Sequence, residues 1–179
     1  MNQRVLIEKN YLRIPIRKDA VEKNVWLYQE LTAVLQFQAG LFVDYGSGAP
    51  DFYAELPVER WKGSVLTLVH EEDRPVPFLQ SDELLPNTEP FQPWIHFAPK
   101  SGWMNDVCGE CWYQGSYHLY FQHNPFGVQW NNMSWGHAVR SDLLHWQQLE
   151  ETLTPEAAGT ALIGGAILHE GQVEEARAD

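Results

Sequence analysis

The sequence is poor in cysteine and in positive charge, and it has no long hydrophobic run. Two cysteines in 179 residues cannot build the disulfide framework of a small secreted scaffold. Twelve lysines and arginines stand against 24 aspartates and glutamates, which gives a net charge of −12 and a surface that repels phosphate backbones. No apolar run approaches the roughly 18 residues of a membrane-spanning helix. We therefore expect no nucleic-acid partner and no membrane span.

The N-terminal segment also lacks a recognisable targeting signal. Residues 1–17 alternate between polar and apolar side chains and contain no continuous apolar stretch of the kind that a secretory signal peptide requires. If Met1 is the native N-terminus, this pattern predicts a cytoplasmic location.

No window of the sequence has the 3.6-residue apolar period of an amphipathic helix. Short segments of alternating polar and apolar residues, separated by Gly and Pro, occupy the first part of the chain. Their spacing of roughly 8–12 residues is typical of a β-sandwich. The segments expected to form strands are 11–16, 25–28, 34–38, 41–45, 51–56 and 64–69.

A polar, proline-bearing stretch over residues 82–90 predicts a linker. We expect a β-sandwich accessory module over 1–88 and a second unit over 89–179. In that unit, strands at 111–113 and 117–121 flank the turn Gln114-Gly115-Ser116, and 134–140 and 146–149 supply two more. Four consecutive antiparallel strands make one blade of a β-propeller, and residues 160–169 are expected to begin the next blade. The predicted fold is all-β.

Aromatic and amide side chains surround one carboxylate in the second part of the chain. Six of the eight tryptophans follow residue 91. Aromatic faces stack on the C–H faces of sugar rings, while amides and carboxylates bind hydroxyl groups. The pattern is consistent with sugar binding, although a single tryptophan in a sheet more often fills the core. The pattern runs through residues 94–106, 120–125, 130, 133–138 and 141–146, and its carboxylate is Asp106.

Several motifs here resemble glycoside hydrolase family 32, the β-fructofuranosidases, which include invertases, levanases and inulinases. The family hallmark is Trp-Met-Asn-Asp-Pro-Asn-Gly, and residues 103–109 read Trp-Met-Asn-Asp-Val-Cys-Gly. Tyr-Phe-Gln-His-Asn-Pro, Met-Ser-Trp-Gly-His-Ala and Ser-Asp-Leu-Leu-His-Trp follow in family order, at 120–125, 133–138 and 141–146. The resemblance covers residues 91–150. A weaker one links the first part to the β-sandwich module that precedes the propeller in some bacterial levanase-like members.

The resemblance implies hydrolysis of β-fructosidic bonds in sucrose, levan or inulin on a five-bladed propeller, by a retaining two-carboxylate mechanism. It implies that Asp106 is the nucleophile and that Trp103, Asn105, Gln122 and Trp130 line the fructose pocket. No cofactor and no metal are expected, because two carboxylates suffice for this reaction. The expected partner is a fructose-containing sugar, with self-association through an exposed blade edge.

The chain departs from the family pattern in three places. Val107-Cys108 replaces Pro-Asn, so the loop that aims Asp106 is expected to differ. In the next blade, the segment 162–165 replaces a family aromatic-Ser-Gly segment, and Ile163 cannot bond to a hydroxyl. The family's Arg-Asp-Pro and acid/base Glu-Cys motifs have no counterpart, and Glu110 of the pair Glu110-Cys111 lies on the wrong blade. We expect this chain alone to be inactive; the alternative is a non-catalytic, fructan-binding or assembly remnant.

Other candidate residues have structural interpretations. Cys108-Gly-Glu-Cys111 has the spacing of a redox pair or half a zinc site, but the sequence offers no second cysteine pair and no helical redox context. We expect two thiols in a turn. We also expect structural roles for His137 and His145. Asp142 is expected to form a turn, with its carboxylate capping backbone N–H groups.

Overall fold

The computed structural model describes residues 1–179 except 44, 45, 47, 87–95, 143, 155–163, 170, 171, 178 and 179. Within these residues the chain is all-β, as predicted, and its one helical element is the short 3-10 helix η1 (Glu59–Trp61). Among the same residues, no helix has the length and apolar character needed to cross a membrane.

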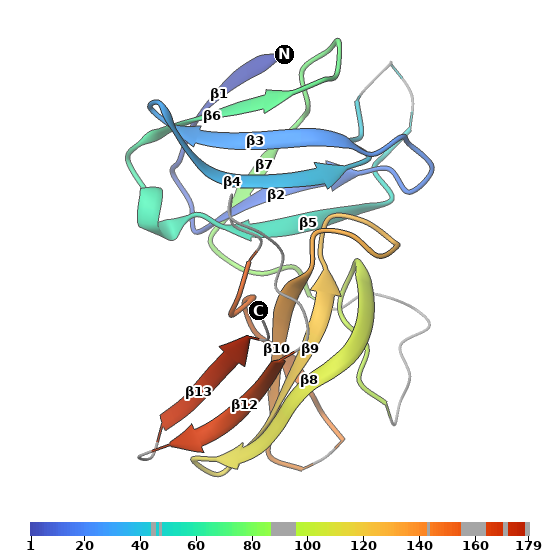
Figure 1. The fold of residues 1–179 in the computed structure, drawn as a ribbon. Coiled ribbons are helices and arrows are strands. Elements are labelled where there is room, and N and C mark those ends of the chain that lie inside the picture. The colour runs from blue at the N-terminus through green and yellow to red at the C-terminus, as the bar shows by residue number, and fades with distance from the viewer. Residues whose placement is uncertain are drawn as a thin grey trace.

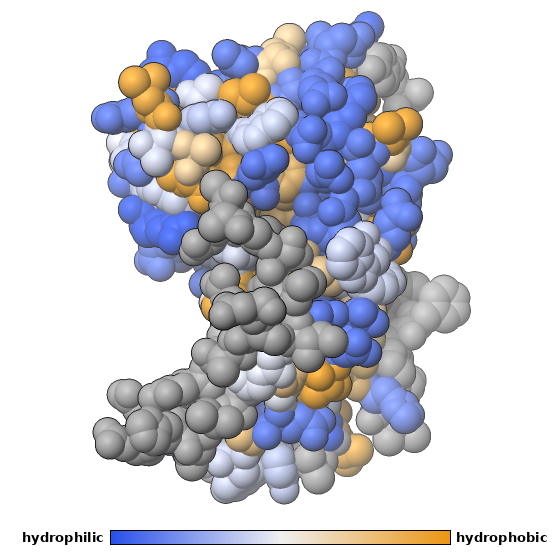
Figure 2. All heavy atoms as spheres, in the orientation of Figure 1, coloured by the Kyte–Doolittle hydropathy of each residue, from blue (hydrophilic) through white to orange (hydrophobic). Residues whose placement is uncertain are grey.

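The first part of the chain forms two antiparallel sheets that lie one over the other (Figure 1). One sheet has the order β1-β6-β3-β4 and the other has the order β5-β2-β7. Apolar side chains from both sheets share one core, and hydrophilic residues cover much of the sandwich surface in view (Figure 2). The predicted β-sandwich is therefore confirmed. Its strands are β1 (Asn2–Leu6), β2 (Tyr11–Ile16), β3 (Lys23–Gln29), β4 (Thr32–Ala39), β5 (Phe52–Pro57), β6 (Val65–His70) and β7 (Leu79–Ser81).

Five of the six segments predicted here as strands lie in β2 to β6, but the predicted strand 41–45 is wrong. Leu41 makes a single bridge to Ile16, and residues 44 and 45 lie outside the described residues. At Gly40 the backbone passes so close to β2 that a Cβ atom would lie 2.7 Å from the Arg17 carbonyl oxygen. The segment that follows β4 therefore pairs with the end of β2 only through the bridge between Leu41 and Ile16, and its described residues form no strand ladder.

The second part begins with a four-stranded antiparallel meander, β11-β10-β9-β8, which is the size of one propeller blade. Its strands are β8 (Trp103–Tyr113), β9 (Ser116–Asn124), β10 (Ser134–Arg140) and β11 (Gln147–Gln148). Gln114 and Gly115 have φ of 48° and 80° and close a two-residue hairpin turn, which confirms the predicted β8–β9 turn. Strand β10 matches its predicted range, and β11 is shorter than predicted.

A second hairpin follows, formed by β12 (Gly164–His169) and β13 (Gln172–Arg177), and β12 lies beside β8 (Figure 1). It occupies the place expected for the start of another blade, although residues 160–163 lie outside the described residues. The predicted boundary near residue 88 lies outside them as well.

Candidate active site

A β-bulge in β8 places Asp106. Met104 is opposite His123 and Val107 is opposite Phe121, so Asn105 and Asp106 together face the single residue Gln122. A bulge re-aims a side chain out of the normal alternation of a strand, and bulges are common next to active sites. Both bulged residues are exposed. The carboxylate of Asp106 is thus presented on a rigid strand at the protein surface.

The bulge is tied to the neighbouring strand by an amide pair. Asn105 Nδ2 donates a hydrogen bond of 3.1 Å to Oε1 of Gln122, whose side chain is buried in the middle of the sheet. This bond fixes the residue directly before Asp106. The structure therefore brings together Asn105, Asp106 and Gln122, three of the five residues predicted for the site.

The expectation that a loop aims Asp106 is wrong, because Val107 and Cys108 continue strand β8. The register shifts a second time at Cys108, whose thiol packs in a small core with Tyr120 and Trp135. Its Sγ donates to the carbonyl oxygen of Asp106 at 3.8 Å. Strands tolerate proline at bulges, where a ladder hydrogen bond is already missing. Valine in place of the motif's proline is therefore compatible with the same irregular strand.

The two tryptophans of the predicted site come from other places. Trp103 begins β8 opposite Asn124 and is half-buried. Trp130 lies in the β9–β10 loop, with 61% of its surface exposed. Over the ranges that the structure describes, no hydrogen bond or ring contact joins Trp130 to the other four predicted residues. An exposed indole is available for stacking on a sugar ring.

Gly102 sets the entry of the chain into β8. Its φ is +81°, and a Cβ atom there would lie 2.3 Å from the carbonyl oxygen of Asn124. Only glycine combines this left-handed backbone with so close an approach to another strand. The position of Trp103, and of the bulge behind it, therefore depends on the absence of a side chain at residue 102.

Gly102→Ala is expected to lower the free energy of unfolding by about 3 kcal/mol, from left-handed strain and overpacking against Asn124. Gly115→Ala is the matched control, because Gly115 has a φ of +80° but a Cβ atom there meets nothing within 4 Å. That control is expected to cost about 1 kcal/mol, from backbone strain alone. Urea denaturation of both variants measures the difference, and equal losses would contradict a steric role for residue 102.

A buried pair, His123 and Glu151, lies beside the site. His123 on β9 contacts both Glu151, which follows β11, and Ser101, which precedes β8. His123 Nδ1 is 2.7 Å from Glu151 Oε1, and its Nε2 is 2.8 Å from the Ser101 carbonyl oxygen. The carbonyl can only accept, so Nε2 carries a proton, and an ionised Glu151 requires a second proton on Nδ1. Burial disfavours the charged ring, but the Glu151 carboxylate outweighs it, and the pKa of His123 is raised. The sequence analysis missed this pair, whose members lie 28 residues apart.

The remaining candidates have structural surroundings. Burial, and then the neighbouring His118, lower the pKa of His137 to about 4, so its ring is neutral near pH 7. That ring stacks on Tyr120 at 4.5 Å and shares a 3.0 Å hydrogen bond with His118. The carboxylate of Asp142 accepts hydrogen bonds from the backbone N–H groups of Leu144 and His145, which confirms its predicted turn-forming role.

Both cysteines are free, and the expected turn is wrong because Cys108 and Cys111 both lie within β8. Burial raises the pKa of each thiol, which disfavours the reactive thiolate. Among the residues that the structure describes, no group of three or more His, Cys, Asp or Glu is arranged to hold a metal ion.

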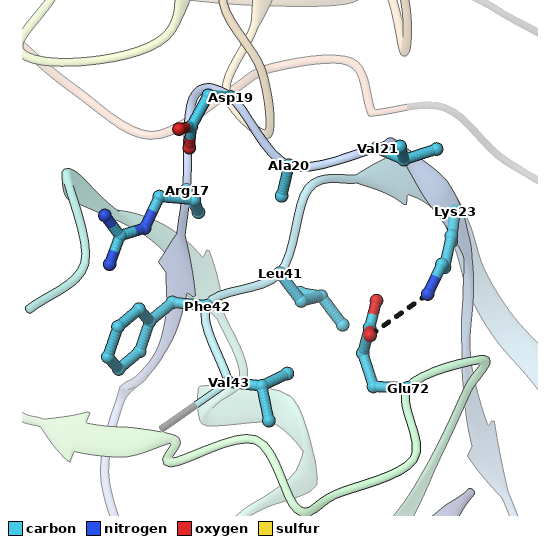
Figure 3. Close-up of a pocket in the computed structure, with 9 residues that line it drawn as sticks. All are labelled: Arg17, Asp19, Ala20, Val21, Lys23, Leu41, Phe42, Val43 and Glu72. Atoms are coloured by element: carbon cyan, nitrogen blue, oxygen red, sulfur yellow. Dashed lines mark hydrogen bonds and ion pairs between the residues drawn. The ribbon is translucent and has the colours of Figure 1, made fainter. Parts of the chain in front are cut away.

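A cavity of about 440 Å³ opens on the sandwich, between the end of β2 and the segment that follows β4 (Figure 3). Three of the four charged groups in its lining are engaged: Arg17 lies over the ring of Phe42, and Lys23 pairs with Glu72 at 3.1 Å. None of the five predicted site residues lines this cavity. The site residues instead belong to the blade and to its β9–β10 loop.

Comparison with known proteins agrees with the motifs in the blade. Residues 96–173 match the model of the glycosyl hydrolases family 32 N-terminal domain. The levanase of Bacillus subtilis (strain 168) is 45% identical over 80 residues, which are 45% of this chain and 12% of the levanase. The extracellular exo-inulinase of Aspergillus awamori is 43% identical over 72 residues, which are 40% of this chain and 13% of the inulinase.

A solved glycoside hydrolase family 32 structure from Bifidobacterium adolescentis aligns with 93% of this chain and 31% of its own, at 24% identity and a TM-score of 0.45. The chain thus spans 12% and 13% of the two curated relatives and matches them over a segment. The range matched by the family model, residues 96–173, includes the bulge, the amide pair and Trp130. Over residues 96–173, the chain is similar to the N-terminal domain of glycosyl hydrolases of family 32.

Proposed function

We propose that the protein forms the N-terminal part of a glycosidase that cleaves β-fructosidic bonds, of the sucrose, levan or inulin type, with Asp106 as the nucleophile. The observation that carries this proposal is the bulge, which presents Asp106 at the surface beside the Asn105–Gln122 amide pair. The named relatives are a levanase and an exo-inulinase, and their activities support this substrate class.

In the proposed reaction, one Asp106 oxygen attacks the anomeric carbon of a fructosyl unit, and the bond to the leaving oxygen breaks. A second carboxylic acid donates its proton to that oxygen, and then removes a proton from the water that hydrolyses the fructosyl ester. Asn105 and Gln122 are proposed to bind fructose hydroxyls, because amides both donate and accept hydrogen bonds. Trp103 and Trp130 are proposed to supply aromatic walls of the pocket.

Glu110 does not fit the role of the second carboxylate. Retaining glycosidases hold their two carboxyl groups about 5–5.5 Å apart. Glu110 lies four residues along the same strand, and an extended chain advances roughly 3.3 Å per residue, so the two backbones are separated by on the order of 10 Å. We therefore propose that the acid/base group lies outside the blade formed by β8 to β11.

The purified 179-residue chain is expected to release no fructose from sucrose, inulin or levan, because it offers one assigned carboxylate where the reaction uses two. A coupled assay for free fructose measures this, with Asp106→Asn beside it. Release that disappears in the variant would show that the chain itself supplies a working acid/base group, and would contradict the expected inactivity.

The proposed nucleophile itself is tested in a chimera. The matching segment of the Bacillus subtilis levanase is replaced by residues 96–173 of this chain, and the chimera is expected to release fructose from levan. Far-UV circular dichroism and thermal melting show whether it folds. A second chimera with Val107→Pro and Cys108→Asn restores the family motif. If both chimeras fold and neither hydrolyses levan, the proposed role of this segment is wrong.

A further inference from the structure

The β9–β10 loop, residues 125–133, packs against the sandwich. Phe126 is buried and belongs to the sandwich core, although it follows a strand of the blade. Its ring stacks on Phe37 of β4, with centroids 3.9 Å apart and an interplanar angle of 14°. The loop that carries Trp130 thus has an apolar anchor in the other unit.

A second anchor is a pair of hydrogen bonds between Asn132 and the main chain of Gln38. The Gln38 N–H donates to Asn132 Oδ1 at 2.7 Å, and Asn132 Nδ2 donates to the Gln38 carbonyl oxygen at 2.8 Å. Strand β4 is at the edge of its sheet, where main-chain groups have no strand to pair with. One side-chain amide therefore occupies both groups of an edge residue, as an additional strand would.

The same asparagine organises the loop internally. Asn132 has a φ of +44°, a left-handed conformation that asparagine tolerates better than most residues. Its Nδ2 also donates to Oδ1 of the buried Asn124 at 3.0 Å. Asn124 in turn donates to the Gln129 carbonyl oxygen at 2.9 Å and accepts from the Phe126 N–H at 3.1 Å. These bonds connect both ends of the loop through Asn124. Trp130 lies between Gln129 and Asn132, which both bond to Asn124.

We propose that the sandwich serves as a scaffold for the sugar-binding loop, with Asn132 as the positioning residue for Trp130. The link to fructose rests on the proposed function, because that function gives Trp130 its place in the pocket. The mechanical part of the proposal, that the sandwich holds the loop in place, is independent of that function. It rests on two direct contacts between sandwich and loop: Phe37 with Phe126, and Gln38 with Asn132. The sandwich then shapes the pocket from outside the propeller and needs no sugar site of its own.

Fluorine NMR of the 179-residue chain, labelled with 5-fluorotryptophan, tests the mechanical part. The Trp130 resonance is assigned by its loss in Trp130→Phe. Asn132→Asp keeps the side-chain size but removes the donor to the Gln38 carbonyl oxygen. We expect the Trp130 resonance to shift or broaden and the Trp26 resonance on β3 to stay in place.

Gln38→Ala is the matched control, because Asn132 contacts only the main chain of Gln38. It removes the side-chain hydrogen bonds to Asn131 and Asn24 and keeps both main-chain bonds to Asn132, so it is expected to leave the Trp130 resonance in place.

Phe37→Leu removes the ring that stacks on Phe126, and so disturbs the loop through a residue of the sandwich. It provides a second test if Asn132→Asp does not fold. We expect it to move the Trp130 resonance as well. An unchanged Trp130 resonance in Phe37→Leu, or in a folded Asn132→Asp, would overturn the proposal.

The two proposals fail in different experiments. An inactive, folded levanase chimera removes the link to fructose but leaves the coupling between sandwich and loop as measured by NMR. If the chimera is active but the Trp130 resonance is unchanged in both Asn132→Asp and Phe37→Leu, the scaffold role is wrong and the proposed fructosidase function stands.

Discussion

Asp106→Asn in the levanase chimera is expected to reduce fructose release by about 10⁴-fold or more, which is the scale of losing a catalytic nucleophile. The substitution keeps the shape of the side chain and the hydrogen bond between Asn105 and Gln122, since neither residue bonds to the Asp106 side chain. It removes the carboxylate that forms the fructosyl ester. Initial rates of fructose release from levan, at saturating substrate, measure the effect.

Glu110→Gln is the control for this substitution, because Glu110 is an exposed carboxylate on the same strand. It is expected to change the rate by less than about threefold, as a surface residue outside the reacting group. A loss at Glu110 comparable to the loss at Asp106 would show that both carboxylates act in catalysis, against the spacing argument. A fully active Asp106→Asn chimera would remove Asp106 from the mechanism.

His123→Ala is expected to lower the free energy of unfolding of the 179-residue chain by about 3–5 kcal/mol, the cost of removing one partner from a buried ion pair. Without the ring, the largely buried Glu151 carboxylate and the Ser101 carbonyl both lose a donor. Urea denaturation measures the loss. His145→Ala is the control, because His145 pairs with Asp142 at the surface with 85% of its side chain exposed, and its loss is expected to stay under about 1 kcal/mol.

The same pair predicts how stability depends on pH. The folded pKa of His123 is raised above its value of about 6.5 in the unfolded chain. Its stabilising contribution is therefore complete below about pH 6.5 and is lost as the pH rises through the folded pKa. Unfolding measured from pH 6.5 upward should show a decline in the native chain that Glu151→Gln flattens. A decline of equal slope in Glu151→Gln would mean that another group titrates.

Alternation of side chains made most of the sandwich predictable, because the strands β2 to β6 each bury one face in a shared core. The hairpin turn at Gln114-Gly115 was predictable for a local reason, since its backbone needs two positive φ angles. The start of β8 at Trp103 was not, because two register shifts interrupt the period that marks a strand. The prediction therefore began that strand at Cys111.

The parts of the site that depend on distant partners were also beyond the sequence pattern. Asn132 and Gln38 lie 94 residues apart, and nothing local to either residue indicates that one amide will close the edge of β4. Asp106, Asn105, Gln122, Trp103 and Trp130 were predicted from a motif resemblance. The structure supplies what the motif could not: the bulge, the amide bond and the exposure of Trp130.

Because β8 contains two register shifts, the number of residues in its motif is constrained more tightly than the residue types. Because side chains in a strand alternate between faces, one extra residue inverts every later residue, and a second extra residue restores the original order. The shifts at Asn105-Asp106 and at Cys108 form such a pair, so only the short stretch between them is out of phase with the rest of the strand. Exchanges of residue type, such as valine for proline, leave this count unchanged. A single-residue deletion would turn Trp112 and its neighbours to the opposite face of the sheet. We therefore expect the fold to tolerate insertions and deletions in this stretch only when they comprise two residues.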